Sequence, residues 1–186
     1  MPITIDVMWL KTELPRPGEI IKAFISALPV DMARDRSLLT MESSVAWGVE
    51  VSPNADLKLY NTYVINYDGM GLVNFMLFEV DNPEIYGEVE EPLRSLLEQF
   101  EGNFANNEFN SLISNWENCG GIEFSVEHER GSANWTWNTF LYFLAALAKL
   151  GNGYAFGELG NISHLPYGLY GPNELFAAAE SYVFGN

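Results

Sequence analysis

Hydrophobic and polar residues alternate along several stretches of this chain, and such alternation predicts β-strands. Three stretches carry it clearly, and two more are apolar and rich in β-branched and aromatic residues. We therefore expect strands at residues 3–10, 45–51, 59–67, 72–80 and 122–129. Asp68 to Gly71 form a turn cluster, which predicts a hairpin between the third and fourth strands. The strand at 72–80 is apolar on both faces, so we expect cover on each side of it.

Apolar residues at helical spacing predict amphipathic helices at residues 19–28, 93–100, 109–116 and 172–183. The most apolar stretch is 134–150, and no residue between Phe140 and Ala148 is charged. A membrane span needs roughly 20 apolar residues, so we expect a buried central helix instead. Residues 29–42 are interpreted as a solvated connection with room for one helical turn. The glycine-rich stretch 151–171 is interpreted as mostly loop, with room for one short strand.

The predicted order of elements is β-α-β-β-β-α-α-β-α-α, which is typical of an α+β fold rather than an alternating α/β fold. We expect a largely antiparallel sheet of about five strands, packed against the buried central helix and several amphipathic helices. The chain of 186 residues is long enough for one sizeable core, and no stretch has the composition of a linker. Residues 1–186 are therefore expected to form a single domain.

The charge of the chain is large and unevenly distributed. Nine basic residues stand against 25 acidic residues, which gives a net charge of −16. Residues 79–129 hold 13 acidic residues and one basic residue, Arg94, and so account for −12 of that charge. Such a segment repels nucleic acids and anionic membranes and attracts cationic surfaces. Solubility alone would explain the total charge, but it does not explain the clustering.

Two features bear on the compartment. The first residues, Met1 to Asp6, have neither the basic start nor the apolar run of a secretory signal. Cys119 is the single cysteine, so no disulfide can form within the chain. We therefore expect a cytoplasmic location and no association with membranes.

Motifs for catalysis or metal binding are weak in this sequence. His128, His164 and Cys119 do not have the short spacing of a zinc site, and a lone cysteine is typically a small buried residue. Residues 81–88 match a calcium loop only loosely, and the glycines of 151–157 have the wrong spacing for a phosphate-binding loop. The sequence predicts no catalytic residues, no metal and no cofactor. An enzyme whose site is assembled from distant residues stays open.

The acidic segment supports our main hypothesis. Carboxylates that surround aromatic and aliphatic side chains between residues 81 and 101 are typical of a surface for a basic protein partner. We expect a small acidic inhibitor that neutralises a basic protein such as a toxin or a nuclease and does not bind nucleic acid directly. In composition alone the chain resembles bacterial immunity proteins and antitoxins, a resemblance that transfers no residues. The predicted partner-binding residues are Glu84, Tyr86, Glu88, Glu90, Glu91, Glu98, Glu101, Glu123, Glu127 and Glu129, the last three facing outward on the strand at 122–129.

Two alternatives stay beside this hypothesis. Glycines let the backbone approach a ligand closely, and aromatic rings supply apolar walls. The segment 151–171 could therefore hold the site of an enzyme or a small-ligand-binding protein, lined by Tyr154, Glu158, His164, Tyr167 and Tyr170. The second alternative is a nucleic-acid mimic, in which carboxylates take the places of phosphates.

Overall fold

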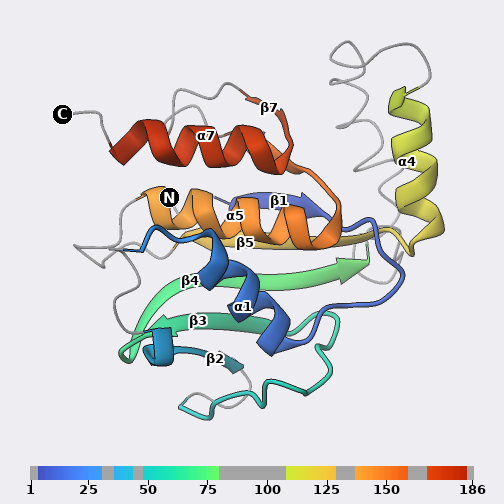
Figure 1. Ribbon diagram of the computed structural model, residues 1–186. Coiled ribbons are helices and arrows are strands. Elements are labelled where there is room, and N and C mark those ends of the chain that lie inside the picture. Colours follow the sequence, from blue (N-terminus) through green and yellow to red (C-terminus); the bar gives the residue numbers. More distant parts are fainter. Residues whose placement is uncertain are drawn as a thin grey trace.

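The computed structural model describes residues 4–30, 36–43, 48–79, 108–128, 137–158 and 167–183. Within these ranges, seven strands form one antiparallel sheet in the order β2-β3-β4-β5-β1-β6-β7 (Figure 1). The α+β prediction is confirmed, and the sheet has more strands than the five expected. The strands are β1 (Thr4–Met8), β2 (Leu39–Ser43), β3 (Thr62–Tyr67), β4 (Met70–Glu79), β5 (Ile122–His128), β6 (Ala155–Glu158) and β7 (Tyr167–Tyr170).

The hairpin between β3 and β4 confirms the turn predicted at residues 68–71. Asp68 and Gly69 both have positive φ values, 49° and 75°. Two successive residues of this kind match the right-handed twist of the strands they join, and an Asp-Gly pair tolerates that conformation. The longest ladder of the sheet, between β4 and β5, is not local, and β1 lies between β5 and β6.

Four α-helices and one short 3-10 helix lie within the described ranges. They are α1 (Pro17–Ala27), α4 (Glu108–Asn118), α5 (Trp137–Gly151), α7 (Pro172–Val183) and η1 (Arg36–Leu38). Helices α1, α5 and α7 lie side by side on one face of the sheet, with α5 in the middle (Figure 1). None of the helices in these ranges combines the length and the apolar character that crossing a membrane requires.

Helix α5 is the buried central helix that its composition predicted. Every side chain from Phe140 to Ala148 is at most 4% exposed. Phe143 contacts Phe24 of α1 edge to face, with ring centroids 5.2 Å apart, and Phe75 of β4 at 5.9 Å. Each fully buried side chain of this size contributes roughly 1.5–3 kcal/mol through removal of apolar surface from water. The same core contains Ile5, Val7 and Trp9, which confirms the face predicted for the first strand.

A smaller cluster covers part of the other face of the sheet. Helix α4 confirms the helix predicted at 109–116 and buries Phe109, Ile113 and Trp116. These side chains form one cluster with Met8 of β1 and Phe156 of β6. The companion helix predicted at 93–100 lies outside the described residues.

Two predictions about strands were wrong. The strand expected at 45–51 is absent from its described part, 48–51, where Glu50 forms only an isolated bridge with Glu42 and Val49 is 59% exposed. Part of the connection expected at 29–42 is instead strand β2, because Leu39 and Met41 alternate into the core and pair with β3.

The stretch 151–171 also differs from the expected loop. It contributes the end of α5 and the paired strands β6 and β7, which extend the sheet beyond β1. Its sequence allowed one short strand rather than a pair, because both strands are only four residues long and contain glycines.

Candidate functional site

The face of the sheet that points away from α1, α5 and α7 carries the polar side chains of the strands, and we call it the second face. Strand register arranges its residues in three rows that cross the strands. The rows are Thr4, Glu127, Asn74, Val64 and Glu42; Asp6, Ser125, Met76 and Thr62; and Met8, Glu123 and Phe78. Neighbours within a row lie directly opposite one another, with Cβ atoms about 4.5–5.5 Å apart.

The ionisable residues in these rows are all acidic: Asp6, Glu42, Glu123 and Glu127. None of the seven described strands contains a lysine or an arginine. The helical side carries both signs of charge: Lys11 and Lys149 flank a cavity between α1 and α5, and α7 contains Glu174 and Glu180. The charged side chains that the strands contribute to the second face are thus all acidic, which favours a negative potential there.

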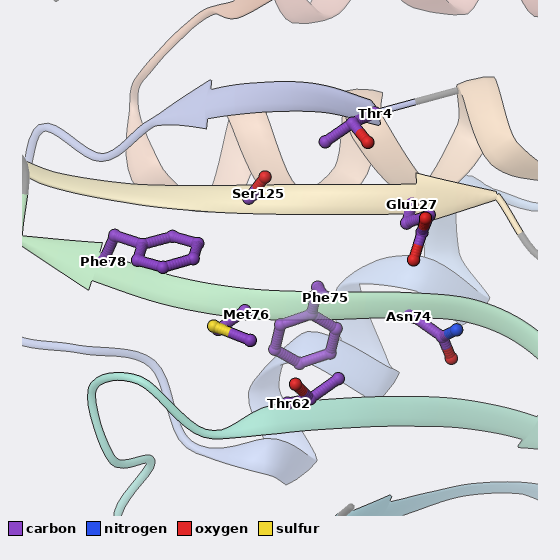
Figure 2. A pocket seen from close by; sticks show the side chains of 8 residues that line it. All are labelled: Thr4, Thr62, Asn74, Phe75, Met76, Phe78, Ser125 and Glu127. Carbon is purple, nitrogen blue, oxygen red and sulfur yellow. The ribbon is translucent and has the colours of Figure 1, made fainter. Parts of the chain in front are cut away.

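A pocket of about 180 Å³ lies on the second face and spans strands β1, β5, β4 and β3. Figure 2 shows it from the side away from the helices, whose faint ribbons lie behind the sheet. Its apolar part includes Met76 and Phe78. Its polar part comprises the hydroxyl groups of Thr4, Thr62 and Ser125, the amide of Asn74 and the carboxylate of Glu127. The expected cover over both faces of β4 is therefore incomplete at this pocket.

One acceptor of this pocket has no partner. The side-chain oxygen Oδ1 of Asn74 is buried and accepts no hydrogen bond. Asn74 lies directly opposite Glu127 in the ladder between β4 and β5, and the two side chains are neighbours in Figure 2. An unsatisfied buried acceptor costs about 1–3 kcal/mol. Glu127 thus offers a carboxylate in the pocket, and Oδ1 of Asn74 beside it could accept from a ligand once the Asn74 side chain turns toward the pocket.

Two carboxyl groups are buried beside the pocket. Glu123 is 4% exposed and lies between Met8 and Phe78 in its row. Asp6 and Glu123 are diagonal neighbours on β1 and β5. Asp6 is directly opposite Ser125, which is two residues along β5 from Glu123. Burial, with a smaller contribution from the charge of Asp6, raises the pKa of Glu123 from 4.5 to about 8.

The pKa of Asp6 is also raised by burial, and the effect is opposed by a hydrogen bond that the Ser125 hydroxyl donates to its carboxylate. Like charges at this separation do not both ionise readily. At neutral pH the pair therefore retains a proton, which resides on Glu123. The oxygen Oε2 of Glu123 has no hydrogen-bond partner. The pair therefore holds a proton at neutral pH and can release it, which would add negative charge beside the pocket.

The structure corrects the role expected of Glu123. It lies on the face opposite the main core, as its alternation predicted, but it is buried and cannot contact a partner in this conformation. The physical reason is that Met8, directly opposite, is covered by α4. Glu127 is half-buried and lines the pocket. The other predicted partner-binding residues, Glu84, Tyr86, Glu88, Glu90, Glu91, Glu98, Glu101 and Glu129, lie outside the described residues.

Sequence reasoning missed Asp6, Asn74 and Ser125 as members of a site. Each is a polar residue at an alternate position of a strand, which is a signal that the pattern contains. The ladder of β1 with β5 places Asp6 opposite Ser125, and the ladder of β4 with β5 brings Asn74 beside them. Strands β1 and β5 are more than 100 residues apart in the chain.

The glycines at the start of the segment 151–171 have a packing role. A Cβ atom at Gly151 would overlap the ring of Trp9, and one at Gly153 would overlap the carbonyl oxygen of Met8. They therefore allow a close approach of α5 to β1 rather than to a ligand. Tyr170 is buried in the main core, and burial, together with Glu174, raises its pKa. His164 and the side chains of Glu158 and Tyr167 lie outside the described residues.

Among the described residues, no group of three or more histidine, cysteine or acidic side chains could hold a metal ion. Cys119 is half-buried just after α4. The side chain of His128, and His164 as a whole, lie outside the described residues, so a cysteine–histidine pair is untested.

Comparisons with known proteins identify no relative. No family model matches this chain, and no curated protein or solved structure is significantly similar to it. A proposal about function therefore rests on the charge and geometry of the second face.

Proposed function

We propose that this protein is an acidic binding protein that neutralises a basic protein partner, such as a toxin or a nuclease. The observation that supports the proposal best is the composition of the second face, whose described strands contain no lysine or arginine and carry the partly buried carboxylates Glu42 and Glu127. A surface of one sign steers an oppositely charged partner toward it and disfavours partners of the same sign.

The acidic segment that precedes α4, residues 79–107, would add to the attraction for a basic partner. It carries eight acidic residues and one basic residue, Arg94. Tyr86 within it would serve as an aromatic anchor, because buried aromatic side chains supply much of the binding energy at protein interfaces. The proposal includes a cytoplasmic location, where proteins without disulfides usually act.

The test is capture of a partner by the purified full-length protein from lysates of its source organism and of neighbouring cells. We expect a basic protein, recovered in near-stoichiometric amount at low salt and released at high salt, because salt screens interactions between exposed charges. Replacement of Glu88, Glu90 and Glu91 by lysine should abolish the capture while the protein stays folded.

A matched variant separates the position of these charges from their number. Glu13, Asp56 and Glu180 are exposed and lie off the rows of the second face. Their replacement by lysine changes the net charge equally and should weaken capture much less. Equal loss with both variants would show that only total charge matters. Undiminished capture by the first variant would refute the assignment of the acidic segment.

A further inference from the structure

We propose that the pocket on the second face binds the guanidinium group of one arginine side chain of the basic partner, with Glu127 and Asn74 as its acceptors. This inference rests on the proposed function and specifies the chemistry of its central contact. The pocket belongs to the described part of the chain, so the inference does not depend on the acidic segment that precedes α4.

Two acceptors of the pocket are arranged as a guanidinium group requires. Glu127 and Asn74 are directly opposed across β5 and β4, and Oδ1 of Asn74 is buried without a partner. A guanidinium group carries five N–H donors in one plane, so it can donate to both side chains at once. A hydrogen bond in which both partners are charged is shorter and stronger than a neutral one. Binding would therefore turn the Asn74 side chain toward the ligand and satisfy an acceptor that the free protein leaves buried and unpaired.

The remaining wall of the pocket is polar. Thr4, Thr62 and Ser125 contribute hydroxyl oxygens, which accept hydrogen bonds as well as donate them. The Ser125 hydroxyl donates a hydrogen bond to Asp6, so toward a ligand its oxygen can only accept. The wall is thus rich in acceptors, and no lysine or arginine occurs in the strands that form it.

The apolar part of the pocket and its single carboxylate favour arginine over lysine and over a metal ion. Met76 and Phe78 make part of the pocket apolar. A guanidinium group is weakly hydrated and stacks on aromatic rings, whereas an ammonium group is strongly hydrated. Only one carboxylate lines the pocket, and no metal-binding group of three ligands occurs among the described residues. A volume of about 180 Å³ exceeds that of a water molecule, roughly 30 Å³, and can admit the end of a long side chain.

The buried carboxyl groups of Asp6 and Glu123 lie beside the pocket, and a bound cation would change their ionisation. Asp6 accepts a hydrogen bond from Ser125, and Glu123 interacts with Asp6. An added cation in the pocket favours ionisation of nearby carboxyl groups. Binding should therefore release protons, and affinity should rise with pH as Glu123 loses its proton.

The experiment uses methylguanidinium chloride as the probe, titrated into the full-length protein at constant ionic strength. Heteronuclear NMR follows the side-chain amide of Asn74 and the backbone amides of β4 and β5. We expect saturable shifts at these signals, weaker binding of methylammonium, and no binding of the neutral analogue methylurea. Absence of shifts at Asn74, or equal binding of methylammonium, would overturn the assignment to arginine.

Three variants make the test specific. Glu127→Gln removes one charge from the pocket and should weaken methylguanidinium binding about tenfold or more. Glu180→Gln removes one exposed charge from α7 and should leave the binding unchanged. Asn74→Asp adds a carboxylate and should strengthen it, a gain that misfolding cannot produce. Equal affinity of the Glu127→Gln variant and the unmodified protein would overturn the inference.

The failure of this inference can be told apart from the failure of the proposed function. If a basic partner is captured and Glu127→Gln leaves its affinity unchanged, the pocket is not the contact, although the function stands. If methylguanidinium binds as expected and no basic protein is captured, the pocket stands and the proposed function falls.

Discussion

At the scale of single residues, Glu123 shows how position in the sheet changes the chemistry of a carboxyl group. It is buried between Met8 and Phe78, and its pKa rises from 4.5 to about 8. One pKa unit corresponds to about 1.4 kcal/mol, so ionisation of Glu123 costs the folded state on the order of several kcal/mol. Because the folded pKa exceeds the unfolded one, this cost is absent below about pH 4.5 and grows as the pH rises toward 8.

We therefore predict that Glu123→Gln makes the protein more stable at alkaline pH. Glutamine has the shape of the protonated glutamic acid and cannot ionise. At pH 5 the free energies of unfolding of the variant and the unmodified protein should be similar. At pH 9 the variant should be more stable by a few kcal/mol. Urea denaturation at the two pH values measures the difference.

The control for this prediction is Glu127→Gln on the same strand and the same face. This variant keeps Glu123, so its stability should depend on pH in the same way as that of the unmodified protein. If Glu123→Gln and the unmodified protein lose stability in parallel between pH 5 and pH 9, Glu123 is not the group that titrates.

At the scale of elements, the junction of α5 and β1 depends on one glycine. The Gly153 N–H donates to the carbonyl of Ala148 at 2.8 Å as the helix ends, and Asn152 has a φ of 54°. The chain then passes directly against β1, where the Met8 N–H donates to the carbonyl of Tyr154 at 2.8 Å. This close approach joins the central helix to the middle of the sheet.

Gly153→Ala should destabilise the protein by about 1–3 kcal/mol or more, because its Cβ atom would overlap the Met8 carbonyl oxygen and force the backbones apart. Gly171→Ala is the matched control. Its Cβ atom would meet nothing nearer than a Glu174 oxygen at 3.5 Å, so its effect should stay within about 0.5 kcal/mol. Thermal unfolding of both variants measures the contrast, and equal melting temperatures would contradict the packing role of Gly153.

At the scale of the whole molecule, the two faces of the sheet are covered to different extents by helices. Three helices bury one face completely around α5, and α4 covers the second face only in part. The protein therefore has its larger hydrophobic core on one face and, on the other, a smaller core under α4 beside a polar pocket. Substitutions in the helical core should affect folding, and substitutions in the pocket should affect binding.

Leu144→Ala tests this division. Leu144 is 0% exposed in the middle of α5, and loss of such a side chain typically costs 2–5 kcal/mol. Val30→Ala is the control, because Val30 is 82% exposed and its loss should cost within about 0.5 kcal/mol. Chemical denaturation measures both. A cost below 1 kcal/mol for Leu144→Ala would contradict the central position of α5.

The sequence by itself determined the elements whose hydrophobic pattern is long and regular. The alternation of Ile5, Val7 and Trp9 identified β1, the uninterrupted apolar run identified α5, and Asp68-Gly69 identified the hairpin. The uneven distribution of charge also follows from the sequence alone, and the hypothesis of a basic partner was based on it. In each case the information is local, because the pattern within one element reports which face is buried.

Only the tertiary structure decided which strands are neighbours and therefore which polar residues meet. Nothing in the local pattern shows that β1 pairs with β5, or that β6 and β7, too short to be predicted, extend the sheet. That pairing brings Asp6 beside Ser125, and the ladder of β4 with β5 places Asn74 opposite Glu127. It also places Glu123 next to Met8 under α4, so that a residue expected to face water became buried. Burial and pairing arise from contacts between distant segments, and these contacts are a property of the folded chain rather than of any one stretch of it.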